Sequence, residues 1–356
     1  MKLEIFPIEA DKKKPKPDWN QLGFGKHFSD HFFIMKYDQS QGWHHPKIEA
    51  YRPLTLDPAA IVLHYAQEIF EGLKAYKCQN GAIHLFRAKE NLMRMNRSAK
   101  RLCMPEIDID FVHSALKELI LIDQEWIPTT SGSSLYIRPT MIGTEPTIGV
   151  KASSEFIFYI IVGPAGSYYA EGFSPIRIFV SDQYVRAVRG GVGEAKTGAN
   201  YAASLLAGQE AKKAGYSQVL WLDAIEQKYV EEVGTTNIFF QFENELVTSP
   251  LTGTILPGIT RDSVAKLAQN WGMKYVERRI SMEEVTEGAN SGQLKEVFGS
   301  GTAAVISPVS ELHYKGKTYK IGNGKTGPVA QKFYDELVGI QYGKKPDPFG
   351  WIERIN

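Results

Sequence analysis

Hydrophobic and polar residues follow two different periods along this chain, and the alternation between them predicts a mixture of strands and helices. Apolar residues that recur every three or four positions predict helices over 88–103, 109–122, 201–214 and 260–271, and a last helix that carries Val329, Phe333, Leu337 and Ile340. Short apolar runs bounded by glycine, proline or polar residues predict strands over 81–87, 134–139, 155–162, 176–181, 218–223, 228–232, 237–242, 296–300 and 303–308. The run 155–162 is almost wholly apolar, so we expect both of its faces to be buried.

The regular pattern begins near Ala59 and is interrupted once by a cluster of glycines and prolines. We place an interdomain linker there, over residues 166–175. It divides a smaller N-terminal α/β domain, 1–165, from a larger C-terminal domain, 176–356. The predicted fold class is therefore α/β (α+β), with two mixed domains, as a length of 356 residues favours. The charged segment 11–17, DKKKPKP, is expected to be a solvated arm.

Composition excludes several classes of protein. An apolar share of 43% supports folded cores and argues against disorder. The chain carries 41 basic and 40 acidic residues, and this balance argues against a nucleic-acid or membrane-surface partner. Two cysteines, an N-terminus without an apolar leader and no His or Cys spacing typical of a metal site predict a cytoplasmic protein without disulfide or metal.

Lys196 lies in the segment GGVGEAKTGANY, among small residues that would let a planar ligand approach its amine. Removal from water lowers a lysine pKa toward the nucleophilic range. The segment alone fits an exposed lysine in a glycine loop equally well. The segment also matches the phosphate-loop pattern at all positions but one, because Ala195 stands where the second glycine belongs. The residues before it make a poor strand, which a phosphate loop requires.

Three further turns could bind a ligand. In EEVGTTN, a carboxylate opens a tight turn where it could meet a cationic ring nitrogen, although a hairpin with solvated acids fits as well. In LPGITRDS, the chain enters a helix whose first N–H groups could bind phosphate, with Thr260 as a cap or a hydroxyl ligand. In GSGTAA, backbone N–H groups and Thr302 could form a second anion-binding turn or a plain corner.

Arginine and tyrosine side chains could form a polar rim around an apolar pocket. Tyr136 and Arg138 are two residues apart in a strand and therefore share one face. An arginine there could hold a carboxylate through two parallel hydrogen bonds. Arg94 could do the same or simply be a solvated helix residue.

Taken together and in this order, Arg94, Lys196, EVGTTN, LPGITR and GSGTAA resemble the branched-chain amino acid aminotransferases, which are fold-type IV pyridoxal-phosphate enzymes. The likeness runs from about Phe24 to Tyr342. The segments LHYAQEIFEGLKAY and LYIRPTMIG are similar to the longer branch of that family. Some members of this branch carry a Cys-x-x-Cys pair where this chain has Ala304 and Ser307, so a thiol switch at that place is not available here.

The resemblance implies a fold, a cofactor and residue roles. Lys196 would bind pyridoxal 5′-phosphate covalently and shuttle the proton between substrate and cofactor. Glu232 would keep the pyridine nitrogen protonated, and Tyr201 would hydrogen-bond the phenolic oxygen. The phosphate would be bound by Arg94, Ile259, Thr260 and Thr302, and Thr235 would also contact the cofactor.

The substrates implied are leucine, isoleucine or valine in one half-reaction and glutamate or 2-oxoglutarate in the other, in branched-chain amino acid biosynthesis. Arg138 would receive the distal carboxylate of glutamate. The side-chain pocket would be shaped by Phe24, Tyr65, Phe70, Tyr136, Tyr168, Thr302 and Ala303. The family also implies a homodimer, with Tyr65 supplied by the partner subunit.

Other functions stay open. A D-amino acid aminotransferase or an aminodeoxychorismate lyase would use the same cofactor site, although these enzymes are usually shorter and lack the LYIRP arrangement. A non-catalytic binding protein would have no need of both Lys196 and Glu232. A nucleotide-binding protein with a degenerate phosphate loop is a remote alternative.

Overall fold

The computed structural model describes residues 1–166 and 173–356, and the chain forms two compact units. The first comprises Met1–Tyr168, Ala195–Gly198 and Gly339–Asn356, and the second comprises Tyr169–Glu194 and Ala199–Val338. Both units mix strands with helices, as predicted for the fold class. Unlike the two continuous domains predicted on either side of 166–175, each unit consists of separate stretches of the chain. The short segment Ala195–Gly198 and the C-terminal residues Gly339–Asn356 belong to the first unit.

The first unit is built on one mixed sheet. Its strands run in the order β1-β3-β2-β8-β7-β5-β6-β18, with β4 paired to β7. Their bounds are β1 Glu4–Ile5, β2 His31–Asp38, β3 Gly42–Ala50, β4 Glu68–Phe70, β5 Leu73–Lys77, β6 Ile83–Phe86, β7 Ser134–Gly143, β8 Glu155–Ala165 and β18 Ile352–Arg354. Adjacent strands are antiparallel except β1 and β3.

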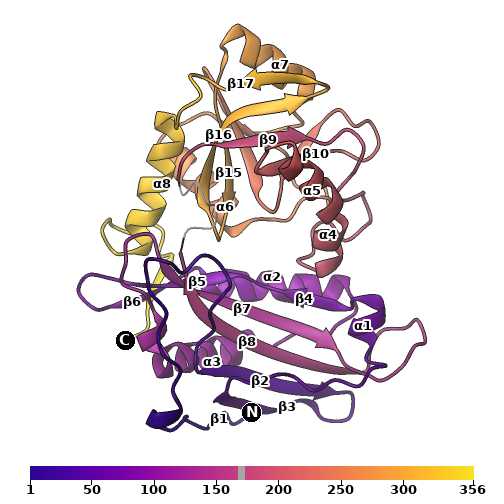
Figure 1. The fold of residues 1–356 in the computed structure, drawn as a ribbon, viewed down its shortest axis with the longest axis vertical. Coiled ribbons are helices and arrows are strands. Elements are labelled where there is room, and N and C mark those ends of the chain that lie inside the picture. The colour runs from indigo at the N-terminus through magenta and orange to yellow at the C-terminus, as the bar shows by residue number, and fades with distance from the viewer. Residues whose placement is uncertain (167–172) are drawn as a thin grey trace. The chain divides into compact units, whose positions relative to one another are not determined.

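Two long helices, α2 Ala88–Arg101 and α3 Ile109–Ile122, bury their apolar faces against this sheet (Figure 1). Leu92 and Met95 of α2 and Leu116 of α3 pack in one core with Phe33 and Ile137 of the sheet. Burial of such apolar area is the main stabilising contribution of the unit. Short helical segments complete it: η1 Ala10–Lys12, α1 Ile61–Tyr65 and η2 Gln124–Trp126.

The second unit also contains a mixed sheet, with the strand order β11-β10-β9-β16-β15-β12-β13-β14 and β17 paired to β16. The strands are β9 Ile176–Val180, β10 Gln218–Leu222, β11 Val230–Val233, β12 Asn237–Phe242, β13 Leu246–Thr248, β14 Tyr275–Glu277, β15 Leu294–Gly301, β16 Val305–Tyr314 and β17 Lys317–Lys320. Its helices are α4 Gly198–Ala203, α5 Leu205–Lys213, α6 Ile259–Asn270, α7 Met282–Ser291 and the greater part of α8 Pro328–Gln341. Among the described residues, every helix is too short or too polar to cross a bilayer.

Four expectations from the sequence are corrected by the structure. Ordered structure begins well before Ala59, since β2 and β3 form a hairpin over 31–50. The predicted helix 201–214 is two helices, which meet at Ser204. The hydroxyl of Ser204 donates to the carbonyl of Tyr201, so the side chain competes with the helical backbone at this point. Strand β8 buries one face, with Phe158 and Ile160, while its other face is only half-buried.

The fourth correction concerns the arm 11–17, which is bound to the first unit rather than solvated. The backbone N–H of Lys14 donates to Asp30 Oδ1 at 2.9 Å, and its ammonium donates to the Ser29 carbonyl at 2.8 Å. The ammonium of Lys16 lies 4.2 Å from the ring centroid of Trp126, whose indole N–H in turn donates to Asp30. Lys14 and Lys16 therefore bind the arm to the first unit, through a charge-assisted hydrogen bond and a cation–π contact respectively.

Candidate active site

Lys196 is held by its backbone on both sides. Its N–H donates to the hydroxyl of Ser98 on α2 at 2.9 Å, and its carbonyl accepts from the N–H of Phe70 at 3.0 Å. The Lys196 ammonium lies 5.0 Å from the ring centroid of Phe70, and the residue is half-buried. The segment is therefore a fixed part of the first unit, not an incidental exposed loop, and it presents a lysine amine next to an aromatic face.

Arg94 is buried at 3% exposure, so the interpretation as a solvated helix residue is wrong. Its Nε and Nη2 donate to the two carboxylate oxygens of Glu71 at 2.7 and 2.8 Å. Burial alone would raise the pKa of Glu71, but the charge and hydrogen bonds of Arg94, with Lys196 and Asn91, hold that pKa below its ordinary value. Sequence reasoning missed Glu71, although it lies within the segment EIFEGLKAY.

Tyr136 and Arg138 share one face of β7, as predicted. The guanidinium of Arg138 donates to the Tyr136 hydroxyl at 3.1 Å and lies 4.6 Å from the ring centroid of Phe70. The ring of Phe24 meets that of Tyr136 edge-on at 4.8 Å. A side chain on Gly72 would place its Cβ 2.1 Å from the Tyr136 hydroxyl oxygen, so glycine is required there. Three aromatic rings and one guanidinium therefore gather on one face of the sheet.

Glu68 adds a carboxylate that sequence reasoning did not select. Burial raises the pKa of Glu68, more than a hydrogen bond from the Gly198 backbone and the charge of Arg138 lower it. A Cβ on Gly198 would lie 2.0 Å from Glu68 Oε1, so the glycine after Lys196 permits this close approach.

Two predicted pocket residues are not brought to this group. Tyr65, at the end of α1, is 43% exposed, and its hydroxyl donates to the carbonyl of Ile148. Tyr168 lies outside the described residues.

Glu232 lies on β11 in the second unit and is buried at 3% exposure, so the interpretation of this turn as a hairpin with solvated acids is wrong. Its Oε2 accepts from Arg186 Nε at 3.0 Å, and its Oε1 accepts from Asn237 Nδ2 at 2.9 Å and from the N–H of Leu256 at 3.0 Å. These donors favour the charged carboxylate. Arg186 was missed, since it lies outside every motif.

The structure joins the three turn motifs of the second unit through Asn237. Besides Glu232, the Asn237 amide donates to the carbonyl of Leu256 at 2.9 Å. Gly258 leaves room for it, because a Cβ there would lie 2.0 Å from Asn237 Oδ1. Asn237 also pairs with Ser300 between β12 and β15, so GSGT lies beside EVGTTN.

The remaining predicted residues occupy turns and helix starts of the second unit. Ile259 and Thr260 are the first residues of α6, both buried, and the N-cap is Gly258 rather than Thr260. Thr302 and Ala303 occupy the half-buried corner between β15 and β16, Thr235 is exposed in the turn after β11, and Tyr201 lies half-buried on α4. Residues 181–197 form no strand, so Lys196 lacks the strand that precedes a phosphate loop.

Comparison with known proteins relates this chain to one group of enzymes. Residues 68–312, more than half of the chain, match the family Amino-transferase class IV. Branched-chain-amino-acid aminotransferase 2 of Bacillus subtilis (strain 168) is 53% identical over 96% of this chain and 94% of its own.

Solved structures agree with this relationship. The branched-chain amino acid aminotransferase of Escherichia coli is 29% identical, with 91% of this chain and 99% of the other covered and a TM-score of 0.75. The T.th. enzyme of the same name, in complex with N-(5′-phosphopyridoxyl)-L-glutamate, is 27% identical, with 94% and 100% covered and a TM-score of 0.73. The family match covers most of the chain, and the Bacillus subtilis relative is 53% identical over nearly all of it. The chain therefore belongs to the class IV aminotransferases.

Proposed function

We propose that this enzyme transfers the amino group of L-leucine, L-isoleucine or L-valine to 2-oxoglutarate, giving the branched-chain 2-oxo acid and L-glutamate. The observation that carries the proposal is the 53% identity, over 96% of this chain, to an aminotransferase named for branched-chain amino acids. The aromatic and cationic side chains around Arg138 support it, because the two substrates demand both an apolar surface and a carboxylate partner.

The cofactor that we propose is pyridoxal 5′-phosphate, which the complex of the T.th. relative carries as a phosphopyridoxyl group joined to glutamate. The residues present fit it. Glu232 is a buried carboxylate with charged and neutral donors, suited to a protonated ring nitrogen. The start of α6 at Ile259 and Thr260 suits a phosphate, and Arg94 and Thr302 are further candidates. Tyr201 and Thr235 complete the proposed cofactor set.

When bound, the cofactor supplies an aldehyde that takes up an amino group and a ring that accepts negative charge from the substrate Cα. Lys196 binds that aldehyde in the resting enzyme and, once released by substrate, moves the Cα proton. Its backbone, fixed by Ser98 and Phe70, holds the amine at a constant position for both tasks. Glu232, kept charged by Arg186, holds the proton on the ring nitrogen.

For the dual specificity, the residues that we propose come mainly from one face of the first unit, while Ala303 belongs to the second unit. Phe24, Phe70 and Tyr136 offer apolar surface to a branched side chain, with Ala303 and Tyr168 as further proposed contacts. Arg138 offers two parallel hydrogen bonds to the distal carboxylate of glutamate. Its hydrogen bond to the Tyr136 hydroxyl and its contact with the Phe70 ring orient the guanidinium before either substrate arrives.

A homodimer is part of the proposal, with Tyr65 reaching the site of the partner subunit. Its exposed position on α1 supports this role. Location in the cytoplasm stays a prediction from the sequence. Sedimentation of the wild type and of Tyr65→Ala, compared with the activity of each, tests the dimer and the contribution of Tyr65 separately.

The absorbance spectrum of the purified protein tests the function directly. We expect a visible band that disappears with L-leucine, as the cofactor takes the amine form, and returns with 2-oxoglutarate. Lys196→Ala is the matched variant and should show neither change. If the protein is coloured and its band does not change with L-leucine but does change with a D-amino acid or with aminodeoxychorismate, the proposed substrate class is wrong and the responding compound indicates the correct one. A protein that stays colourless with added pyridoxal phosphate would refute the proposal.

A further inference from the structure

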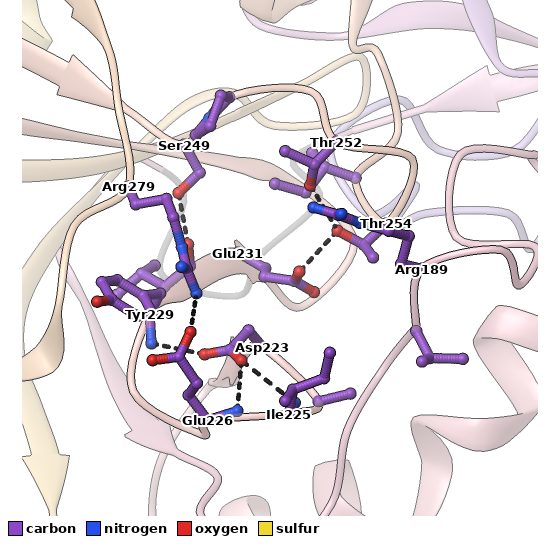
Figure 2. Close-up of a pocket in the computed structure, with 15 residues that line it drawn as sticks. Arg189, Asp223, Ile225, Glu226, Tyr229, Glu231, Ser249, Thr252, Thr254 and Arg279 are labelled. Atoms are coloured by element: carbon purple, nitrogen blue, oxygen red, sulfur yellow. Dashed lines mark hydrogen bonds and ion pairs between the residues drawn. The ribbon is translucent and has the colours of Figure 1, made fainter.

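A second candidate binding site lies in the second unit, at Glu231, the neighbour of Glu232 on β11. It is a cavity of about 210 Å³ whose lining includes Arg189, Glu231, Thr252 and Thr254 (Figure 2). One buried water needs only about 10–15 Å³, whereas drug-sized ligands occupy pockets of roughly 300–1,000 Å³. The cavity therefore suits a small metabolite rather than a nucleotide.

Most charged groups around the cavity are already engaged. Asp223 accepts four backbone N–H bonds from its own turn, at 2.7 to 3.2 Å. Arg279 is paired with Glu226 at 2.7 Å and lies 3.4 Å over the ring of Tyr229. Asp223, Glu226 and Arg279 therefore already have partners within the protein.

Glu231 differs from these groups. It is only 9% exposed, and its Oε1 accepts from the hydroxyl of Thr254 at 2.6 Å. Its Oε2 is buried and has no hydrogen-bond partner among the described residues. A buried carboxylate oxygen without a donor costs free energy, and burial raises the pKa of Glu231 despite the Thr254 hydrogen bond and the charge of Arg186. A donor on a ligand, and a cationic donor most of all, would satisfy it.

Arg189 supplies the opposite charge. In the part of the chain that the structure describes, its guanidinium makes no hydrogen bond or ion pair, and it does not pair with Glu231. Figure 2 shows its side chain beside Thr252 and Thr254, with the Glu231 carboxylate facing the same hydroxyls. Val188, Ile225 and Ile255 add apolar lining. A ligand with a cationic donor for Glu231, an anionic group for Arg189 and a short aliphatic part for the apolar lining would therefore match this cavity.

We propose that this cavity binds a small aliphatic α-amino acid as a zwitterion, with its ammonium on Glu231 Oε2 and its carboxylate on Arg189. The site is separate from the Glu232 cluster yet connected to it. Thr254 binds Glu231 through its hydroxyl, and the carbonyl of the same residue accepts from Arg186, the partner of Glu232, at 2.8 Å.

Calorimetric titration with L-valine tests the site. The holoenzyme is first converted to its amine form, which cannot condense with an amino acid, so that only non-covalent binding is measured. We expect about one L-valine per chain, with affinity at least about tenfold weaker in Glu231→Gln and in Arg189→Met. Arg177→Met, at an exposed arginine outside the cavity, should bind as the wild type does. Isobutylamine and 3-methylbutanoate, which each lack one charge of L-valine, should also bind at least about tenfold more weakly.

Two results would overturn the inference: no binding of L-valine up to about 10 mM, or binding that both cavity variants leave unchanged. Arg189 is exposed, so its variant keeps the test decisive if Glu231→Gln fails to fold. The inference does not depend on catalysis. A chain that takes up no cofactor contradicts the proposed function, while the same titration on that chain still decides the cavity.

Discussion

Arg186 and Glu232 form a buried ion pair, with Arg186 Nε 3.0 Å from Glu232 Oε2 and both side chains less than a tenth exposed. The guanidinium also donates to the carbonyls of Thr254 and Gly193, at 2.8 and 3.2 Å. Arg186 therefore ties the proposed partner of the cofactor ring to the loop that leads into Lys196. It positions Glu232 without being assigned a contact with substrate.

Replacing Arg186 should damage both stability and turnover. Arg186→Met leaves a buried carboxylate without its charge partner, which costs about 3–5 kcal/mol of unfolding free energy. The carboxylate of Glu232 also loses the group that positions it, so kcat should fall more than KM for L-leucine changes, and Arg186→Lys, which keeps the charge, should recover part of kcat. Urea denaturation and steady-state kinetics are the measurements. A purely structural role would lower stability and leave the kcat of the folded enzyme unchanged, while Arg177→Met serves as the exposed control.

Arg138 should separate the two half-reactions. Charge-assisted hydrogen bonds contribute about 1.5–3 kcal/mol, so Arg138→Met should weaken 2-oxoglutarate binding roughly 10- to 150-fold. The half-reaction with L-leucine should change little, since no carboxylate lies at the end of that side chain. Arg138→Lys keeps the charge but loses the planar fork and should lie between the two. Equal losses with both substrates, measured in single turnovers, would contradict this role for Arg138.

Glu71 should stabilise the first unit in a pH-dependent way. Its folded pKa is lowered below the ordinary 4.5, so its contribution is fully present above that pH and is lost as the pH falls through the folded pKa. Glu71→Gln, which leaves Arg94 buried without a counter-charge, should cost about 3–5 kcal/mol at pH 7. The deficit should shrink in acid. Glu9→Gln, at the exposed ion pair with Lys12, should cost less than about 1 kcal/mol. Denaturation curves at pH 7 and pH 4 make the comparison.

Lys74, on β5, should also make stability rise with pH, but over an alkaline range and because burial penalises its charge. Burial lowers its pKa from 10.5 to about 8. Below pH 8 the folded chain therefore holds a buried charge, and between pH 8 and 10.5 the unfolded chain binds more protons. Stability should rise over that window by up to about 3 kcal/mol, at 1.36 kcal/mol for each unit. Lys74→Met should be more stable than the wild type at pH 7 and should lose this rise. Parallel pH profiles for the two proteins would show that Lys74 is not responsible.

Local patterns predicted those elements whose ends are also set locally. Helix α3 begins and ends where the apolar period does, at Ile109 and Ile122, and the side chain of Asp108 caps it by accepting from the N–H of Phe111. Strand β2 was missed, although its run Phe32–Met35 is as apolar as the run that predicted β8, the strand with which it pairs more than 100 residues away. The break at Ser204 depends on one hydroxyl, which an apolar period does not register.

For the candidate site, residue type and order were sufficient to select Lys196, Glu232 and Arg138 and to indicate the family. Their partners required the fold. Glu71 meets Arg94 only because β4 and β5 pack against α2, and Arg186 meets Glu232 across 46 residues of chain. A motif preserves the chemistry that a few neighbouring residues can supply. Ion pairs between distant segments depend on how the chain folds back on itself, and burial then determines how strongly each pair acts.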